Sequence, residues 1–347
     1  MKWKGWNAMN SRILSGLLGA LVVTALAAPT TASAAAMTLK FAMPGSPHDV
    51  HYQQVLIPWA KKVEQDSKGA VKIQFFVGPR LANFHNMLDR ILNGVVDIGF
   101  GLLGPTGQPF PRTDVAQLPF ITGDPALVAP ALYTLYQNGT IAEEYKRWKV
   151  LAVFSFPGLQ IHGTVPLNGM DGLKGHKFSV TNKVISQALT TVGGIPVSMA
   201  PPDQYQAIAN GVLQGTTMPW TGVDDFKIYE VAKYHLVANL GVPVAYVFMS
   251  KASYEKLPVA AKKAIDENSG MGFSRALGNN TSQHGKEVAK KIGSLPGHKV
   301  HVLSADQRAK WETLLQPITD AWAKATPNGA AILAAYKELV EKYKNGK

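Results

Sequence analysis

The chain has 347 residues, 46% of them hydrophobic and 17% charged, which is the composition of a globular protein long enough for two domains. It contains no cysteine, so disulfides, thiol catalysis and thiolate metal sites are excluded. Its net charge is +12, but the lysines are scattered in isolated pairs without interleaved aromatic residues, which argues against a nucleic-acid surface.

Residues 1–36 have the pattern of a secretory signal peptide. Three basic residues within the first twelve precede an apolar run over 13–28, and Ala-x-Ala cleavage sequences lie between 32 and 36. The alternative is an uncleaved membrane anchor, which the small residues at the end of the run disfavour. We therefore expect cleavage near residue 36, export to the periplasm and a mature chain without a membrane span. Removing the three leader bases from +12 leaves a net charge of +9.

The rest of the chain alternates predicted strands and helices. The first half carries strands at 38–43, 71–77, 95–100 and 149–156 and helices at 50–67, 83–93 and 124–137. The central stretch carries strands at 177–180, 197–199 and 215–218 and helices at 183–192 and 201–210. The last part carries a strand at 245–250, a largely helical region over 255–295, a short strand at 300–303 and two helices over 304–324 and 327–343. Ser304 and Gln307 form a predicted capping box.

Strands that alternate with helices of about ten residues indicate βαβ units and parallel sheets. We predict an α/β protein of two lobes, between which the chain crosses more than once, with a long bracing helix within 255–295. Lobe I is expected to comprise 37–155 plus 245–284, and lobe II 156–244 plus 285–347. Ligands of such sheets bind beyond the carboxyl ends of the strands, so we expect a ligand cleft between the lobes, which close on a hinge.

Several motifs suggest chemistry but lack the required context. Gly99-x-Gly101-x-x-Gly104 matches a dinucleotide fingerprint, but three prolines within the next seven residues forbid the helix that such a site needs. The pairs His48/His51 and His298/His301 each lack a third metal ligand. We therefore expect no cofactor and no metal.

No constellation of residues argues for an enzyme. The adjacent acids Asp224-Asp225 and Glu143-Glu144 do not face the same direction on a helix, so neither pair forms a catalytic dyad. A nucleophile motif of the G-x-S-x-G type and a metal-binding H-E-x-x-H motif are both missing from the sequence. We predict a binding protein.

The order of several segments resembles the solute-binding subunits of TRAP transporters (tripartite ATP-independent periplasmic transporters, DctP type). The segments that carry this resemblance are GAVKIQFF from Gly69, NGVVDIG from Asn93, QLPF from Gln117, GLKGHKFSV from Gly172, GGIPVSM from Gly193, YQAIANGVLQG from Tyr205 and KIYEVAKY from Lys227. The resemblance covers essentially the whole mature chain. It implies a periplasmic receptor that captures a small organic solute and hands it to a permease with a small and a large membrane subunit.

This chain departs from the family at the positions that the resemblance assigns to the ligand. The arginine that clamps a substrate carboxylate falls at Ser179, and a second common arginine falls near Leu159, with Gln160 beside it. An asparagine of the family falls at Met218, and an acid of the first lobe falls near Asn86. Several positions that are charged in the family are thus neutral or apolar in this chain.

Two further sets of residues complete the expected site. Pro201 follows the end of a predicted strand and is therefore expected near the cleft. Phe156 and Trp220 are aromatic residues at predicted strand ends or in loops. For any single aromatic residue, the alternative to ligand contact is packing in the hydrophobic core. The expected ligand-binding residues are therefore Phe156, Leu159, Gln160, Ser179, Pro201, Met218, Trp220 and Asn86.

We interpret the missing arginine as a sign that the solute is neutral, aromatic or largely apolar, because serine cannot replace the two-bond fork of arginine. A rival hypothesis keeps a carboxylate whose charge is met by a relocated base, for which Lys183, His162 or Arg112 could serve. The alternatives to a transport receptor are an exported two-lobe enzyme or a sensor that presents its closed form to a membrane receptor. We expect a monomer.

Overall fold

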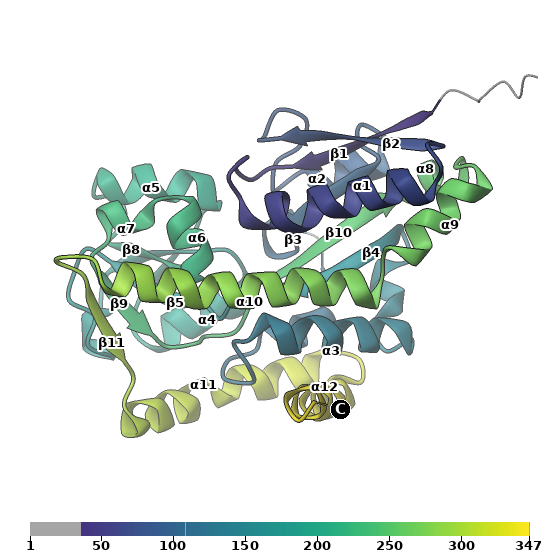
Figure 1. The fold of residues 1–347 in the computed structure, drawn as a ribbon. Coiled ribbons are helices and arrows are strands. Elements are labelled where there is room, and N and C mark those ends of the chain that lie inside the picture. The colour runs from purple at the N-terminus through teal and green to yellow at the C-terminus, as the bar shows by residue number, and fades with distance from the viewer. Residues whose placement is uncertain (1–35, 108, 347) are drawn as a thin grey trace, which may run out of the picture. The chain divides into compact units, whose positions relative to one another are not determined.

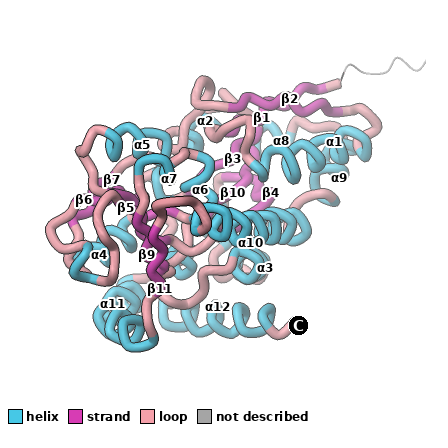
Figure 2. The backbone as a smooth tube through the Cα atoms, turned by 60° about the vertical axis from the view of Figure 1, so that its left-hand side comes forward, coloured by secondary structure: helices cyan, strands magenta, loops and turns pink. Residues whose placement is uncertain are grey.

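The computed structural model describes residues 36–107 and 109–346, so the predicted leader lies outside the described residues except for Ala36. In this part of the chain the strands form two sheets (Figures 1 and 2). The first has the order β2-β1-β3-β10-β4, with β1 Met37–Met43, β2 Val71–Val77, β3 Ile98–Leu102, β4 Trp148–Ser155 and β10 Val244–Ser250. The second has the order β11-β9-β5-β8-β6-β7, with β5 Gln160–Gly163, β6 Lys177–Val180, β7 Ile195–Ser198, β8 Gly215–Met218, β9 Tyr234–Val237 and β11 Lys299–Val302.

Helices pack against both sheets. Those associated with the first sheet are α1 Ile57–Asp66, α2 Met87–Leu92, α3 Pro125–Gln137, α8 Lys251–Glu255 and α9 Val259–Glu267. The central segment carries α4 Lys183–Thr191, α5 Pro201–Ala209, α6 Trp220–Asp225 and α7 Ile228–Val231. The chain ends with α10 Met271–Gly293, α11 Ala305–Ala325 and α12 Gly329–Lys344. Short helical turns occur at Tyr52–Leu56, Gly104–Thr106, Thr113–Gln117, Ala142–Tyr145 and Met170–Gly172.

Two segments carry the chain between the sheets, as predicted. The first follows β4 and leads to β5, and the second follows β9 and leads back to β10. The two segments are hydrogen-bonded to each other, with Phe156 N donating to Pro243 O at 2.9 Å and Leu159 N donating to Gly241 O at 2.8 Å. Because it returns from the second sheet, β10 enters the first sheet antiparallel to β3 and β4.

The long helix α10 braces both sheets. Over its 23 residues it packs against α3 and β4 of the first-sheet part and against α6 of the second-sheet part (Figure 1). Small residues allow this close approach: a Cβ added at Gly278 would lie 2.6 Å from Pro125 O, and one at Gly285 would lie 2.7 Å from Pro157 Cγ. The predicted bracing helix is therefore confirmed.

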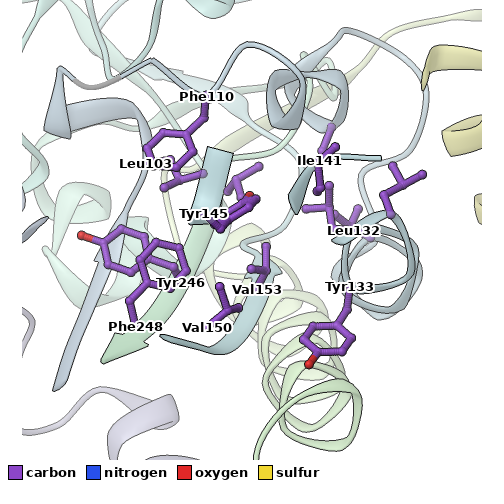
Figure 3. Close-up of a cluster of buried hydrophobic side chains, with 14 of the residues drawn as sticks. Leu103, Phe110, Leu132, Tyr133, Ile141, Tyr145, Val150, Val153, Tyr246 and Phe248 are labelled. Atoms are coloured by element: carbon purple, nitrogen blue, oxygen red, sulfur yellow. The ribbon is translucent and has the colours of Figure 1, made fainter. Parts of the chain in front are cut away.

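The core of the first sheet extends to the end of the chain. A cluster around Tyr145, Tyr246 and Phe248 fills the space between β4, β10 and the neighbouring helices (Figure 3). Ile332 and Tyr336 of α12 belong to the same cluster. The lobe boundaries remain a prediction, but this packing favours counting α12 with the first lobe rather than with the second, where the sequence placed it.

Most elements lie where the sequence predicts them. Strands β2 and β6 have the predicted bounds, Asp124 caps α3 through a 3.0 Å bond from Ala126 N, and the Ser304–Gln307 capping box is present. The helix predicted over 83–93 is shorter. It begins at Met87, because Asn83 Oδ1 accepts from Asn86 N (3.0 Å) while Asn86 Oδ1 accepts from Asn83 N (2.8 Å), which holds the preceding residues in a turn. None of the helices between 36 and 346 is both long and apolar enough to cross a bilayer.

Candidate functional site

A pocket opens between the two sheets at the carboxyl ends of their parallel strands, where ligands of such sheets bind. The first-sheet side contributes Gly45, Ser46, Asp49, Phe84, Phe100 and Leu102. The crossing segments contribute Phe156, Leu159 and Pro243. The second-sheet side contributes Thr181, Pro201, Thr217, Met218, Pro219, Gly222, Asp225 and Phe226. The pocket holds about 640 Å³ of space not filled by atoms, including the part open to solvent.

The walls of this pocket are mainly apolar and aromatic. Phe100 and Phe156 meet edge to face, with ring centroids 6.4 Å apart and an interplanar angle of 88°. Behind them, the ring of His51 lies 5.1 Å from that of Phe156. Edge-to-face rings of this kind offer a hydrophobic surface that matches the faces and edges of another aromatic ring. The pocket is therefore suited to a small solute with an apolar or aromatic body.

The only charged side chains that line the pocket, among the described residues, are the acids Asp49 and Asp225. Lysine, arginine and histidine are missing from the described lining. Few backbone donors are available at the start of α5, because it begins with Pro201-Pro202 and proline has no N–H, whereas the first turn of α6 keeps the N–H groups of Trp220, Thr221 and Gly222. The described lining thus lacks a basic side chain that could neutralise an anion.

Asp49 is held as a carboxylate by His51. Its Oδ1 accepts from His51 Nδ1 at 3.0 Å and from the backbone N–H groups of His51 and Tyr52 at 2.8 and 3.1 Å. Burial raises the pKa of Asp49, but the attraction of His51 and these hydrogen bonds outweigh it, so the pKa lies below its usual value. The hydroxyl of Thr281 lies 3.2 Å from His51 Nε2 and donates to Ser155 O at 3.4 Å, so both ring nitrogens of His51 can act as donors.

The order carboxylate, imidazole, hydroxyl is that of a catalytic triad, but the hydroxyl is misplaced for catalysis. Thr281 lies on α10 with no exposed surface and does not line the pocket. A nucleophile must reach the substrate, so this group has a structural role that fixes the Asp49 loop against α10. No group of three potential metal ligands occurs within the described ranges.

Asp225 differs from Asp49 because it has no partner. It forms no hydrogen bond or ion pair with the described residues. Burial, followed by repulsion from Asp49 and Asp224, raises the pKa of Asp225 well above its usual value. Its neighbour Asp224 points elsewhere and pairs with Lys291 at 2.9 Å.

Four of the expected site residues line the pocket, namely Phe156, Leu159, Pro201 and Met218. Met218 lies over Gly222, where an added Cβ would come within 2.8 Å of the Met218 sulfur. Leu159 and Phe156 belong to the first crossing segment, and Pro201 is the first residue of α5.

The other four lie outside the pocket walls. Asn86 is used in the turn before α2, and Ser179 is fully buried on β6 with its hydroxyl unpaired. Gln160 joins the crossing segments, because its Oε1 accepts from Ala238 N at 2.8 Å and from Asn239 N at 3.1 Å. Trp220 packs edge-on against His162, with ring centroids 4.8 Å apart.

The three bases considered as replacements for the arginine also lie elsewhere. Arg112 donates to Thr140 O at 3.3 Å, and Lys183 lines a neighbouring hollow beside Asp114. His162 is fully buried and belongs to a chain of histidines. None of the three lines the pocket between the sheets.

The histidine chain runs from the back of the pocket to the surface. His162 Nε2 lies 3.1 Å from Met218 O, the Nδ1 atoms of His162 and His235 are 2.8 Å apart, and His235 Nε2 lies 2.8 Å from His298 Nδ1. Lys233 Nζ is 3.2 Å from His298 Nε2. A carbonyl only accepts and an ammonium only donates, so all bonds of the chain must point from Lys233 toward Met218. Each histidine is then neutral with one defined tautomer.

Sequence reasoning missed the two acids and three of the phenylalanines in the lining. A signal was present for Asp225, since Gly222, Asp225 and Phe226 have the spacing of one helical face. The sequence analysis placed the segment after Pro219 in a loop, and this concealed the helical face. The Gly99–Gly104 motif serves packing rather than ligand approach, because an added Cβ at Gly101 would lie 2.5 Å from the Tyr246 hydroxyl and one at Gly104 would lie 2.6 Å from Thr181 O.

Comparison with known proteins identifies the class to which the fold belongs. The model of the DctP family, described as bacterial extracellular solute-binding protein, family 7, matches residues 41–325. The C4-dicarboxylate-binding periplasmic protein DctP of Rhodobacter capsulatus is 26% identical over 343 residues, covering 95% of this chain and 98% of that protein.

Two solved structures with bound aromatic acids are also similar. A TRAP solute-binding protein from a marine metagenome, specific for aromatic acid ligands and crystallised with 3-hydroxybenzoate, has a TM-score of 0.84 at 27% identity, covering 89% of this chain and 99% of that one. A TRAP solute-binding protein from Rhodoferax ferrireducens with copurified benzoate has a TM-score of 0.82 at 25% identity, covering 89% and 99%. The fold is that of a two-lobe solute-binding protein. The chain belongs to the DctP family of TRAP transporter solute-binding proteins.

Proposed function

We propose that this chain is a periplasmic receptor that captures a small aromatic or apolar solute between its two lobes and delivers it to a TRAP membrane permease. The observation that carries the proposal is the aromatic pocket at the strand ends between the two sheets. Family membership supports the transport role and the permease as partner. The predicted leader supports export.

Hinge closure is the proposed mode of capture. The backbone bonds between the crossing segments, Phe156 to Pro243 and Leu159 to Gly241, form a short two-stranded connection between the sheets. Phe156, Leu159 and Pro243 of this connection also line the pocket. A solute that contacts both lobes and the connection would favour the closed arrangement, since a ligand shifts a conformational equilibrium by its differential affinity for the two states.

The solute is proposed to lack a carboxylate clamp of the usual kind. The related marine and Rhodoferax proteins hold aromatic acids, and the aromatic rings of this pocket suit a similar ring. Here, however, the lining carries no base and Ser179 stands where the resemblance places the arginine. Leaving a buried carboxylate unpaired would cost about 2–5 kcal/mol. We therefore infer a solute that does not depend on a carboxylate.

Binding without turnover is the second part of the proposal, and the same lining supports it. The Asp49–His51 pair ends at the buried hydroxyl of Thr281, which cannot reach a solute. We propose that the solute leaves the protein unchanged. Incubating the protein with its ligand and recovering that ligand by mass spectrometry tests this, because a changed mass would indicate an exported enzyme instead.

A thermal-shift screen tests the solute class. The chain is expressed with its own leader, recovered from the periplasm, unfolded and refolded to remove carried-over ligand, and mixed with matched aromatic compounds and small dicarboxylates. A ligand at a hundred times its dissociation constant stabilises by about 2.7 kcal/mol, which raises Tm by several degrees. We expect hits among aromatic compounds. Hits confined to dicarboxylates would contradict the proposed pocket chemistry.

Restoring the arginine provides the reciprocal test. We expect Ser179→Arg to gain affinity for benzoate and to weaken the binding of the hits from the screen, because a guanidinium supplies the missing carboxylate partner. Ser186→Arg on the outer part of α4 adds the same charge away from the pocket and serves as the control. If Ser179→Arg behaves like this control, Ser179 is too far behind the wall to influence the solute.

A further inference from the structure

We propose that the solute carries a positively charged amino group, which Asp225 receives while the phenylalanine walls hold an aromatic or apolar body. This inference rests on the proposed function, because it assigns the charge of the solute in the same pocket. It departs from the organic acids bound by the related structures described above.

The balance of charge in the pocket is the first argument. Of the two acids in the lining, Asp49 is already matched by His51 at 3.0 Å, whereas Asp225 has neither a hydrogen bond nor an ion pair with any described residue. Buried charges normally have partners in folded proteins. A cationic group of the solute would supply the partner that the protein itself does not.

The position of Asp225 is the second argument. It lies on the same face of α6 as Gly222 and Phe226, and all three line the pocket. The adjacent Asp224 belongs to another face and is paired with Lys291. The helix thus presents one unpaired carboxyl group to the solute and keeps the other acid outside the pocket.

The surroundings of Asp225 are the third argument. Phe84, Phe100, Phe156 and Phe226 line the same space, and aromatic faces attract cations. The free oxygen of Asp49, Oδ2, adds negative potential, because the hydrogen bonds of Asp49 to described residues involve Oδ1. A carboxylate in this place would lie beside two acidic side chains and no base of the described lining, whereas an ammonium would meet acidic groups and aromatic faces.

The ionisation of Asp225 should change when the solute binds. Burial and the nearby Asp49 and Asp224 raise the pKa of Asp225, so a fraction of the free protein holds it protonated. The other charged or titratable groups around this region are His51, His284 on α10 and Lys291 paired with Asp224. An arriving ammonium favours the carboxylate, so its binding releases a proton from Asp225. A neutral solute gives no such release.

Calorimetry on the refolded exported protein with three matched probes tests the inference. The probes are 2-phenylethylamine, 2-phenylethanol and phenylacetate, which share a ring and differ in charge. We expect the amine to bind at least tenfold more tightly than the alcohol, and phenylacetate to bind most weakly. For the amine, heats measured in buffers of different ionisation enthalpy should reveal proton release, and this release should decrease as the pH rises.

Asp225→Asn identifies the residue responsible. The variant should weaken amine binding at least tenfold, abolish the proton release and weaken binding of the alcohol by much less than binding of the amine. Asp224→Asn, which removes the adjacent acid outside the pocket, is the matched control and should change amine affinity by less than about threefold. Equal losses in both variants would show that the effect is a general loss of negative charge, and this would overturn the assignment.

The outcomes separate this inference from the proposed function. Binding of the alcohol or of phenylacetate with no binding of the amine would leave an aromatic receptor in place and overturn the amino-group inference. Amine binding without loss in Asp225→Asn would overturn the role of Asp225. Failure of every aromatic compound in the wider screen would contradict both proposals.

Discussion

Gln160 lies beside a position that the resemblance assigns to the ligand, but its side chain joins the two crossing segments. Its carbonyl oxygen accepts from two backbone N–H groups of the second crossing segment, and its amide nitrogen donates to Gly158 O at 2.9 Å and Asn239 Oδ1 at 2.6 Å. Asn239 itself has a positive φ of 53°, a strained conformation that these bonds help to hold. Three of these four bonds connect the two segments that cross between the sheets, and the bond to Gly158 O lies within the first segment.

Gln160→Ala is therefore expected to lower the free energy of unfolding by about 1–3 kcal/mol, because it leaves buried donors at Ala238 and Asn239 unpaired. Gln206→Ala is the control, since Gln206 is exposed on α5 and its amide bonds only to Asn210. Urea denaturation of both variants measures the difference. A Gln160→Ala protein as stable as the control would show that water replaces the lost acceptor.

The sequence could predict features that depend on neighbouring residues, but not features that depend on contacts between distant segments. Strands β2 and β6 have their predicted bounds because their patterns are local. The use of Gln160 depends on Asn239, 79 positions away, and the burial of Ser179 depends on the neighbouring strands β7 and β8. A local sequence pattern carries no information on such distant partners. This is why the sequence assigned residues such as Gln160 and Ser179 to the site, although they lie outside the pocket walls.

The histidine chain adds imidazole–imidazole hydrogen bonds to the backbone pairing of β5 with β9 and of β9 with β11. Burial, without a compensating charge, lowers the pKa of His162 to about 3. Burial and then the nearby His162, His298 and Lys233 lower the pKa of His235 to about 2. The one-directional hydrogen bonding from Lys233 to Met218 O keeps both rings neutral in the folded protein.

Because of this chain of histidines, we expect the folded protein to lose stability in acid. An unfolded histidine binds a proton below pH 6.5, whereas the folded rings do not until about pH 3, so unfolding takes up protons in this window. Each histidine then lowers the free energy of unfolding by about 1.4 kcal/mol for every pH unit below 6.5, and above 6.5 it has no effect. Urea denaturation between pH 4 and pH 8 measures this slope.

The double variant His162→Gln/His235→Gln is the comparison for this prediction. It should be less stable at pH 8, where the hydrogen bonds are lost, but its stability should fall less steeply between pH 6.5 and pH 4. Nitrogen NMR of the native protein provides an independent check, since it should show Nδ1–H tautomers at His235 and His298 and an Nε2–H tautomer at His162. Equal slopes in the two proteins would place the acid sensitivity elsewhere.

The two sheets are joined by three connections of different kinds. Two are the crossing segments, which are short and line the pocket, and the third is α10, which packs on β4 and α3 of the first sheet and on α6, the helix that carries Asp225. At Gly285 the helix passes so close to Pro157 that a Cβ would lie 2.7 Å from Pro157 Cγ and 3.8 Å from Thr221 Cγ2. One glycine thus sets the spacing between the brace, the first crossing segment and α6.

Gly285→Ala should therefore affect stability and binding together. The added methyl group has no room, because the proline ring is part of the hydrogen-bonded connection, and we expect a loss of about 1–3 kcal/mol of unfolding free energy. Displacing α10 from Pro157 also moves α6, so solute affinity should fall although no pocket residue has changed. Thermal unfolding and calorimetry with the best-bound probe measure the two effects.

Gly272→Ala on the same helix separates crowding from helix propensity. Its added Cβ would meet nothing within 4 Å, so the substitution should leave affinity unchanged and stabilise the protein by up to about 1 kcal/mol, because alanine favours a helix more than glycine does. If Gly285→Ala matches Gly272→Ala in both measurements, α10 can shift along Pro157 without cost. The brace would then not fix the distance between the crossing segment and the helix that carries Asp225.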